Sequence, residues 1–486
     1  MHDTSRPTVT DCRLGGSFSV SYSVDMTDTA LPFIAADPDK GKAVSELDRA
    51  HVFHSWSAQD QIAPLPVAGA AGSRFWDYEG NVYLDFASQL VFTNIGHQHP
   101  KVVAAIQEQA AKLCTIAPAF ANDVRSEAAE LITDHAPEGL NRVFFTNGGA
   151  DAIENAVRMA RVHTGRPKVL TAYRSYHGNT ATAITMTGDP RRWGNEAAGH
   201  HDGNVQKFFG PYLYRSSFYA TTEAEESERA LAHLEQTVQL QGPNTIAAIV
   251  LETVVGTNGI LIPPPGYLAG VRALCDKYGI LYIADEVMAG FGRTGRWFAV
   301  DHWDVAPDLI AFAKGVNSGY VPLGGVIVSD HVHDTFRNKP FPGGLTYSGH
   351  PLACAAAVAT IKTMREEGIV EHAAWLGENV LGPGLRELAE KHPSVGEVRG
   401  LGAFWALDLV KNRETREMFV PYAAAGADAA PMNAVFAEAK KHGVWPMPHF
   451  NRLQITPPLN LGEDEAREGL AGIDAALGVA DSYYED

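Results

Sequence analysis

The sequence predicts an α/β protein that has a mainly parallel β-sheet flanked by helices and a second, smaller α+β domain. Three observations lead to this prediction: short, nearly continuous apolar runs, helical apolar spacing between them, and a change of pattern after about residue 346. Continuous apolar runs are typical of strands that are buried on both faces, as in a parallel sheet clad in helices. The length of 486 residues is enough for two or three domains.

The N-terminal part predicts an arm followed by short strands. Residues 1–45 show weak periodicity, which favours an irregular arm. In residues 46–95 the turn Asp77–Asn81 separates two short strand patterns, at 74–76 and 82–84. We predict that these strands form the N-terminal part of the smaller domain.

Residues 96–345 predict the large domain. Apolar residues recur at helical spacing over 102–113 and over 124–132. The runs that predict its strands are 142–146, 168–172, 246–251, 280–284, 309–313 and 325–328.

Residues 346–486 predict the C-terminal part of the smaller domain. The pattern changes there to a long helix over 351–366, followed by more helix and a few strands, among them 404–409 and 453–456.

The composition argues against nucleic acid or an anionic membrane as the main partner. The chain has 39 Lys and Arg against 57 Asp and Glu, a formal net charge of −18, and both partners require basic patches. The first thirty residues lack an apolar run of signal-peptide type, and no stretch reaches the roughly 18 apolar residues of a membrane helix. We therefore expect a cytoplasmic protein. The cysteines lack metal-ligand or redox spacing and are predicted to be reduced thiols: Cys12, Cys114, Cys275 and Cys354.

Two groups of residues that could carry chemistry follow the first strands, where ligands bind in parallel sheets. Residues 147–151 (Asn-Gly-Gly-Ala-Asp) join a strand to a helix, and small residues there let backbone N–H groups approach a phosphate. Taken alone, such a Gly-Gly is more often a tight turn. Tyr176, followed by His177 and Gly178, could stack on a flat ring or be an ordinary loop aromatic.

Asp285 and Lys314 end two further apolar runs. An acid at a strand end is often a helix cap. Beside a protonated pyridine nitrogen, however, an ionised acid would make that nitrogen a stronger electron sink. A lysine is costly to bury unless it is paired or chemically used, and a lone one is more often ion-paired. The 29 residues that separate the two leave room for a loop, a short crossover and the next strand. The pair could then face each other across one ligand.

Together these segments resemble the class III (ω-) aminotransferases, a branch of the fold-type-I enzymes that use pyridoxal 5′-phosphate (PLP). The resemblance covers roughly residues 50 to 475. Several independent motifs carry it in the right order: Tyr176–Gly178, Asp285–Gly295, Lys314–Gly315 and Gly344–Pro351.

The resemblance implies PLP as the cofactor and a role for each matching residue. Lys314 would hold the cofactor as a Schiff base and then move the proton, while Asp285 would bind the pyridine nitrogen. Tyr176 and Val287 would sandwich the ring. The cofactor contacts implied in total are Gly148, Gly149, Ala150, Tyr176, His177, Glu252, Asp285, Val287, Lys314 and Thr346.

The phosphate loop departs from the family pattern. Relatives usually read Asn-Ser-Gly-Thr-Glu, whereas residues 147–151 lack both hydroxyl side chains. Phosphate binding would then depend on backbone N–H groups and on Thr346, which in the family reaches the phosphate of the neighbouring subunit. The resemblance thus implies a homodimer or a dimer of dimers, and we expect PLP retention to be weaker than in relatives with these hydroxyls.

Two positions bear on the substrate. In the ornithine- and acetylornithine-type branches an arginine lies three residues before a Pro-Pro pair, and here Gln454 stands at that offset. Arg452 lies on the same face of an extended strand and is our candidate to bind a carboxylate or sulfonate; the alternative is a surface arginine at a domain edge. Thr257 stands where the ornithine/GABA-type branches carry a glutamate, which argues against those donors.

The resemblance is strongest to the taurine–pyruvate and ω-amino acid–pyruvate branch. We expect a terminal amine, an ω-amino acid, taurine or a simple amine, as donor and pyruvate or a similar keto acid as acceptor, in a ping-pong reaction. An apolar pocket for the donor would be lined by Trp56, Leu90, Val91 and Phe92. For the last three, plain core packing is an equal alternative.

Three other functions are alternatives to this one. A PLP-dependent decarboxylase or aminomutase of the same family would share Lys314 and Asp285. A regulatory protein without activity would have lost one of these two residues, and both are present. A metal enzyme is not predicted, because the neighbours of the loop histidines do not complete a ligand set: His97, His99 and His350.

Overall fold

The computed structural model describes residues 35–199 and 202–485. Most of the predicted arm, residues 1–34, lies outside the described residues. The end of that arm is not irregular: helix α1 (Pro38–His51) includes residues 38–45. Asp37 caps it by accepting a hydrogen bond from the backbone N–H of Lys40 at 3.1 Å, and the proline lies in the first turn, where its missing N–H costs nothing.

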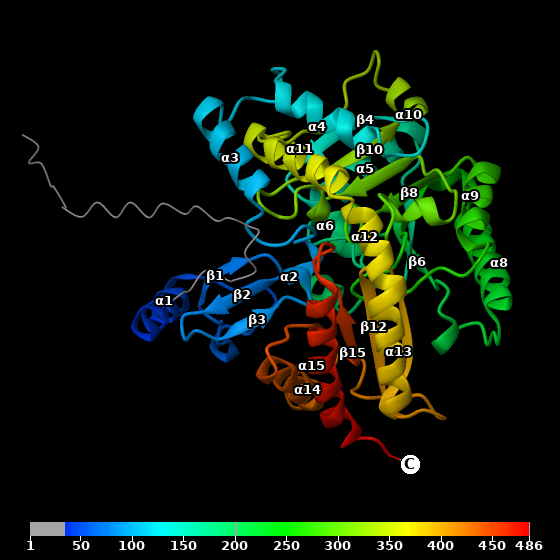
Figure 1. Cartoon of the computed structure of the whole chain (residues 1–486). Helices are drawn as coiled ribbons and strands as arrows, with labels where there is room; N and C mark the ends of the chain where they lie inside the picture. The colour runs from blue at the N-terminus through cyan, green and yellow to red at the C-terminus, as the bar shows by residue number, and fades with distance from the viewer. Residues whose placement is uncertain (1–34, 200–201, 486) are drawn as a thin grey trace, which may run out of the picture. The chain divides into compact units, whose positions relative to one another are not determined.

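A seven-stranded sheet in the order β4-β10-β9-β8-β7-β5-β6 forms the centre of the fold (Figure 1). Its strands are β4 (Leu140–Thr146), β5 (Lys168–Ala172), β6 (Val205–Phe208), β7 (Ile246–Glu252), β8 (Leu281–Asp285), β9 (Leu309–Phe312) and β10 (Gly324–Ser329). All neighbours from β9 to β6 pair in parallel, and β10 runs antiparallel to both β4 and β9. The predicted α/β class with a mainly parallel sheet is confirmed.

Strand β6 was not predicted. It lies at the sheet edge, and only its end residues Val205 and Phe208 are buried. An edge strand therefore lacks the continuous apolar run that indicates the inner strands.

Helices cover both faces of this sheet. The main ones near it are α3 (Pro100–Lys112), α4 (Asp123–Thr133), α5 (Gly149–Thr164), α6 (Ala181–Met186), α8 (Glu223–Gln241), α9 (Tyr267–Tyr278) and α11 (Pro351–Glu366). Helices α5 and α6 pack on one face, in a cluster with Ile283, Leu309 and Ala311. Helices α4, α8, α9 and α11 pack on the other, with Tyr282 and Ile310. The alternation of neighbouring strand residues between two clusters is the reason for their continuous apolar runs.

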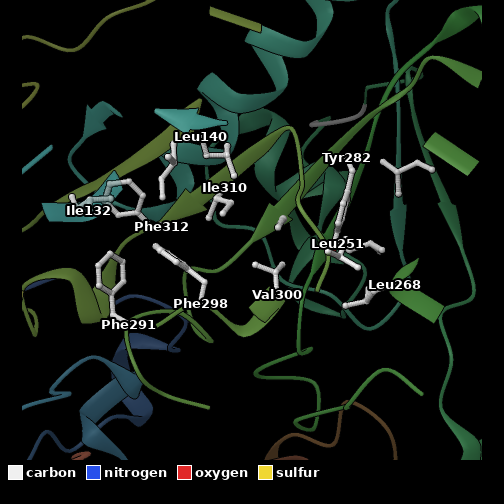
Figure 2. Packing of buried hydrophobic residues seen from close by; sticks show 14 of the residues in the cluster. Ile132, Leu140, Leu251, Leu268, Tyr282, Phe291, Phe298, Val300, Ile310 and Phe312 are labelled. Carbon is white, nitrogen blue, oxygen red and sulfur yellow. The ribbon is translucent and has the colours of Figure 1, made fainter. Parts of the chain in front are cut away.

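The core beneath the strand ends is aromatic (Figure 2). The ring centroid of Phe291 lies 5.3 Å from that of Phe298 and 5.7 Å from that of Phe312, both edge-on. Such pairs add about 0.5–1.5 kcal/mol each beyond the burial of their surface. They hold the loop after β8 against the end of β9, so the two strand ends are fixed relative to each other.

The remaining helices are mostly short or C-terminal. They are α2 (Ser88–Val91), α7 (Arg191–Ala197), α10 (Asp330–Asp334), α12 (Ile369–Leu376), α13 (Gly382–Lys391), α14 (Ala430–Lys441) and α15 (Glu463–Asp481). Among the residues that the structure describes, no helix is both long and apolar enough to cross a membrane.

Two smaller antiparallel sheets complete the fold. One contains β1 (Val67–Ala71), β2 (Arg74–Asp77) and β3 (Val82–Leu84); the other contains β11 (Val395–Leu401), β12 (Phe404–Asn412), β15 (Arg452–Ile455) and β14 (Met447–His449), with β13 (Glu417–Met418) beside β12. Leu84 exchanges backbone hydrogen bonds with Gly443 and Trp445, and Leu84 and Phe86 share a core cluster with C-terminal residues. These contacts support the predicted smaller domain, whose boundaries stay predictions.

Candidate active site

A cavity of about 430 Å³ opens at the carboxyl ends of the parallel strands, where ligands bind in α/β sheets. It is lined by residues that follow β4, β5, β7, β8 and β9. Most of the predicted site residues meet there: Phe92, Gly148, Gly149, Ala150, Tyr176, His177, Glu252, Asp285, Val287 and Lys314.

Asp285, the last residue of β8, is held by two hydrogen bonds. Its Oδ1 accepts from the backbone N–H of Val287 at 3.0 Å, and its Oδ2 lies 2.7 Å from Nδ1 of His177. Nε2 of the same imidazole lies 3.0 Å from Oγ1 of Thr171. His177 thus holds the carboxylate of Asp285 in place.

Glu252 ends β7 beside Asp285, its partner in the parallel ladder. Its two carboxyl oxygens accept from the backbone N–H groups of Tyr176 and Gly256, both at 2.8 Å. Burial, and next the charge of Asp285, raise the pKa of Glu252 to about 7. The carboxyl group is therefore partly protonated near neutral pH, and it ties the ring motif to the loop after β7.

Lys314 follows β9 with a positive φ of 48°. A residue other than glycine is strained there by roughly 1–3 kcal/mol and persists only where its surroundings impose the conformation. Burial lowers the pKa of Lys314 to about 8, although the charges of Asp285 and Glu252 oppose this shift. A neutral amine is the form of lysine that can act as a nucleophile or accept a proton.

The cavity wall near α5 is built from backbone. Helix α5 begins at Gly149 without a side-chain cap, so its first N–H groups are free to bind an anion. A Cβ at Gly149 would lie 2.7 Å from Cγ1 of Val287, whereas a Cβ at Gly148 would meet nothing within 4 Å. Glycine is therefore required at 149 by close approach, and the space at 148 is open.

The class III aminotransferase family model matches residues 56–477. The chain belongs to this family. It is 33% identical to the taurine–pyruvate aminotransferase of Bilophila wadsworthia, over 92% of this chain and 99% of that one. It is 35% identical to the 4-aminobutyrate aminotransferase GabT of Escherichia coli, over 84% and 92% of the two chains.

A solved structure, the taurine:2-oxoglutarate aminotransferase of Bifidobacterium kashiwanohense in complex with PLP and glutamate, superposes with a TM-score of 0.88. It is 42% identical and covers 93% of this chain and 99% of that chain. The protein is thus a PLP-dependent class III aminotransferase of fold type I. Its cavity fits the cofactor: an uncapped helix start, an aromatic side chain, a fixed carboxylate and an amine of lowered pKa line one space.

The structure separates several residues predicted for the aminotransferase site from the cavity wall. Thr346 is exposed and lies off the wall. Leu90 is 66% exposed, and Val91 is buried in a cluster with Val254 and Met288. Val91 is thus packed in the core, as in the alternative interpretation given above, whereas Phe92 lines the cavity. Consecutive residues point in different directions in any regular backbone, and here the backbone is also left-handed at Val91 (φ 58°).

Trp56 and Arg452 lie near the cavity but do not line it. The ring of Trp56 meets that of Tyr176 edge-on at 6.5 Å between centroids. Arg452 lies on β15 and is 2% exposed, so it is not the surface arginine of the alternative interpretation.

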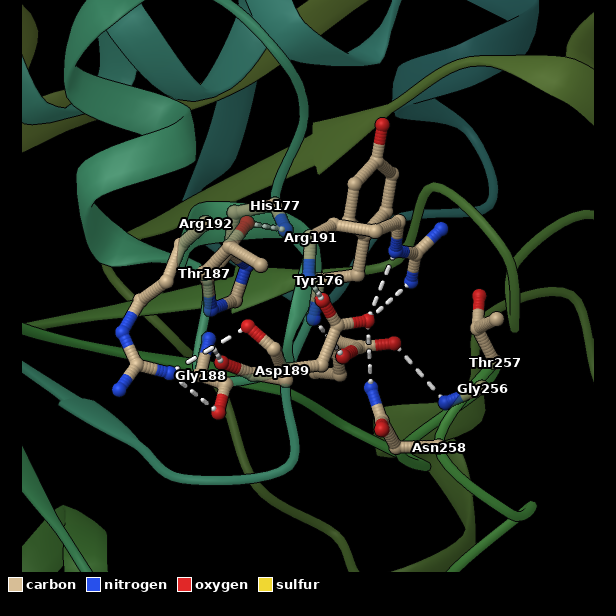
Figure 3. A network of polar contacts seen from close by, with 12 residues as sticks. Tyr176, His177, Thr187, Gly188, Asp189, Arg191, Arg192, Gly256, Thr257 and Asn258 are labelled. Atoms are coloured by element: carbon tan, nitrogen blue, oxygen red, sulfur yellow. Dashed lines mark hydrogen bonds and ion pairs between the residues drawn. The ribbon is translucent and has the colours of Figure 1, made fainter. Parts of the chain in front are cut away.

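Some wall residues of this aminotransferase were not found from the sequence. Asn317, Met288 and the segment 321–323 line the cavity from loops. The polar network around Asp189, close to Tyr176 (Figure 3), was not found from the sequence either. None of these residues ends an apolar run, so the strand-end criterion could not find them; only the Tyr-His-Gly motif indicated that the loop after β5 matters.

Proposed function

We propose that this aminotransferase moves an amino group from a terminal amine, of the taurine, ω-amino acid or simple amine type, to pyruvate or a similar keto acid in a ping-pong reaction. The observation that carries this proposal is that Lys314 and Asp285 line a single cavity. Two of the relatives are taurine aminotransferases, which supports this class of donor. Those relatives differ in acceptor, pyruvate in one and 2-oxoglutarate in the other, so both acceptors belong in the test.

The residues of this chain would have the following roles in the reaction. PLP, when bound, supplies the electron sink. Nζ of Lys314 accepts the proton from the donor carbon and returns it. Asp285, held by His177, would bind the ring nitrogen, and Tyr176 and Val287 would flank the ring. The first N–H groups of α5 bind the phosphate.

Arg452 is proposed to bind the carboxylate or sulfonate of the substrate. Its Nε and Nη2 atoms are buried without a hydrogen-bond partner, and burial lowers its pKa to about 10. Such a cation is costly unless an anion completes its contacts. Strand β15 reaches the cavity wall two residues further on, where Nε2 of Gln454 donates to the carbonyl of Thr257 at 2.7 Å.

A dimer is proposed as the smallest active unit. The phosphate loop lacks side-chain hydroxyls, and Thr346 is exposed and away from its own chain's cavity. A partner subunit's phosphate site would give this hydroxyl an acceptor. Thr346→Ala should weaken PLP binding in a dimer that sedimentation confirms; unchanged binding, or an active monomer, would contradict the proposal. A cytoplasmic location stays a prediction.

A donor panel tests the proposed function. Purified protein reconstituted with PLP is assayed with taurine, β-alanine, 4-aminobutyrate and 1-propylamine, each against pyruvate and 2-oxoglutarate, and the new amino acid is quantified. We expect alanine or glutamate in step with donor loss. Release of carbon dioxide without a keto product would indicate the decarboxylase instead.

Arg452→Ala tests the anion contact. We expect KM to rise more for acidic substrates than for 1-propylamine, because only the acids lose a charge-assisted hydrogen bond. Arg467→Ala is the matched control, since that side chain is 62% exposed on α15. An equal rise in KM for acidic and neutral substrates would count against Arg452.

A further inference from the structure

The ring of Tyr176, which lines the cavity, has a guanidinium stacked on it. Arg191 is the first residue of α7, and its Cζ lies 3.6 Å from the centroid of this ring. Arg191 does not itself line the cavity. Figure 3 shows the guanidinium beside the ring, with Asp189 close to it. One face of the ring is thus occupied by the guanidinium, and the rest of the ring is left to the cavity.

A buried carboxylate fixes this guanidinium. Asp189 is fully buried, and its Oδ2 accepts from Nε of Arg191 at 2.8 Å and also from Nη2. The backbone N–H of Arg191 donates to Oδ1 of the same carboxylate at 2.9 Å, and Asn258 donates to Oδ2 at 3.1 Å. Hydrogen bonds between charged groups are strong, so the guanidinium has a fixed position over the ring.

The segment that carries this carboxylate is folded onto the Tyr-His-Gly motif. The backbone N–H of Gly188 donates to the carbonyl of Ser175 at 2.9 Å, and the backbone N–H of His177 donates to Oγ1 of Thr187 at 3.1 Å. A Cβ at position 188 would collide with the carbonyl oxygen of Ala172, so the close approach requires glycine. The next residue in the chain is the carboxylate that holds the guanidinium.

The backbone of Tyr176 and its ring are held by separate contacts. The backbone N–H donates to Glu252, whose other carboxyl oxygen accepts from the backbone N–H of Gly256. The ring is held instead by the guanidinium, whose carboxylate partner contacts Asn258. Both sets of contacts end on the same loop, residues 256–258. Loss of the guanidinium would therefore free the ring and leave the backbone of the motif in place.

We propose that Arg191 is a positioning residue of the cofactor site: held by Asp189, it fixes the ring of Tyr176 as the surface on which the cofactor ring stacks. This rests on the proposed function, in which Tyr176 flanks the cofactor ring. A guanidinium is attracted to the face of an aromatic ring, and the attraction is stronger away from water. A ring that is already fixed loses little conformational entropy when the cofactor binds, so the cofactor binds more tightly.

Cofactor affinity tests this role without turnover. In Arg191→Gln we expect the Kd of the apoprotein for PLP, measured by fluorescence quenching, to rise about 3- to 30-fold through loss of the cation–π contact. Arg191→Lys keeps a cation over the ring and should recover part of the affinity. The visible circular dichroism of bound PLP reports how the cofactor ring is held. It should weaken in Arg191→Gln and recover in part in Arg191→Lys.

The neighbouring arginine of α7 supplies a matched control. Cζ of Arg192 lies 5.9 Å from the ring centroid of Tyr173, which does not line the cavity. Nη1 of Arg192 also donates to the carbonyl of Gly188 at 3.0 Å, so this side chain holds the same segment without contacting Tyr176. Arg192→Gln should leave the Kd for PLP unchanged. An equal rise in Kd in the Arg191 and Arg192 variants would overturn the proposal, because any weakening of the segment would then suffice.

A double-mutant cycle tests whether Arg191 acts through Tyr176. Tyr176→Leu keeps an apolar side chain but removes the aromatic face. In this background Arg191→Gln should change the Kd for PLP by less than about twofold, because the two residues act through one contact. Additive effects of the two substitutions would overturn the proposal.

A donor comparison separates this role from direct contact with the substrate. In Arg191→Gln we expect kcat/KM to fall by the same factor for β-alanine and for 1-propylamine, since the cofactor serves both. A loss confined to β-alanine, with unchanged affinity for PLP, would show that Arg191 contacts the acid of the substrate and would overturn the positioning role.

Failure of the proposed function gives a different result. If Tyr176→Leu alone leaves the Kd for PLP unchanged, Tyr176 does not flank the cofactor ring, and the roles of both residues are refuted. If Tyr176→Leu weakens PLP binding and Arg191→Gln does not, only the role of Arg191 is refuted.

Discussion

The two ends of the cavity are built in different ways. At the cofactor end, Asp285, Glu252 and Lys314 follow neighbouring strands of one sheet, and the phosphate wall is the backbone at the start of α5. At the proposed substrate end, Arg452 lies on β15, which belongs to a different sheet, and Trp56 precedes the first strand of a third sheet. The cofactor end is thus held by one rigid element, whereas the substrate end depends on how separate segments meet. This difference lets a family keep its chemistry while loops change its substrate.

The two ends also differ in charge. Two carboxyl groups surround the amine at the cofactor end, and one of them, Glu252, has a pKa raised to about 7. At the proposed substrate end, Nε and Nη2 of Arg452 are buried without a hydrogen-bond partner, in a chain whose net charge is −18. A local positive charge in an acidic protein would favour an anionic substrate at this place.

Lys314→Ala should produce the largest effect and tests the cofactor end directly. Without the amine, no group remains to accept the proton at the donor carbon, so kcat should fall at least about 1000-fold. PLP should stay loosely bound, as absorbance after gel filtration would show. The Arg467→Ala protein, prepared in parallel, should be fully active. Turnover close to that of the unmodified protein would refute the assignment of Lys314.

The pH dependence of cofactor uptake tests the charges of the cofactor end. Only neutral Lys314 attacks the aldehyde, and its pKa is about 8. Below this pH the uptake rate should rise about tenfold per pH unit, and above it the rate should level off. In Glu252→Gln the uptake rate should level off at a lower pH, because a charge that raises the pKa of Lys314 is removed. If the uptake rate of the unmodified protein levels off only near the ordinary lysine pKa, Lys314 is not desolvated.

Gly149→Ala should weaken the phosphate wall. The added methyl group would lie 2.7 Å from Val287, and overpacking of this kind costs about 1–3 kcal/mol. We expect a PLP dissociation constant that is raised about 5- to 100-fold, measured by fluorescence quenching of the apoprotein. Unchanged affinity would show that the wall is more adaptable than the backbone geometry indicates.

Gly148→Ser is the counterpart of Gly149→Ala, because it should strengthen PLP binding instead of weakening it. We expect it to have the smallest effect of these variants. A Cβ there meets nothing within 4 Å, and the backbone, at φ −179°, is extended and open to any residue. The new hydroxyl could donate to the phosphate, so PLP should bind roughly 2- to 10-fold more tightly. Weaker binding in this variant would argue that the missing hydroxyls of the loop are not what limits retention.

The sequence by itself determined those features that depend on residues close to one another along the chain. Six of the central strands were predicted, because strands buried on both faces have continuous apolar runs. Lys314 and Asp285 were selected as site residues because they end such runs, and both line the cavity. Residues 147–150 and the segment Tyr176–Gly178, which the sequence analysis also selected, line the cavity as well.

The tertiary structure alone decided which polar groups meet. His177 contacts Asp285 across 108 residues of chain, and Asn258 contacts Asp189 across 69. Neither contact leaves a periodic trace in the sequence, because each depends on the distance between folded segments rather than on spacing along the chain. The same holds for Val91, whose side chain is buried in a core cluster, and for Arg452, whose buried nitrogens have no hydrogen-bond partner.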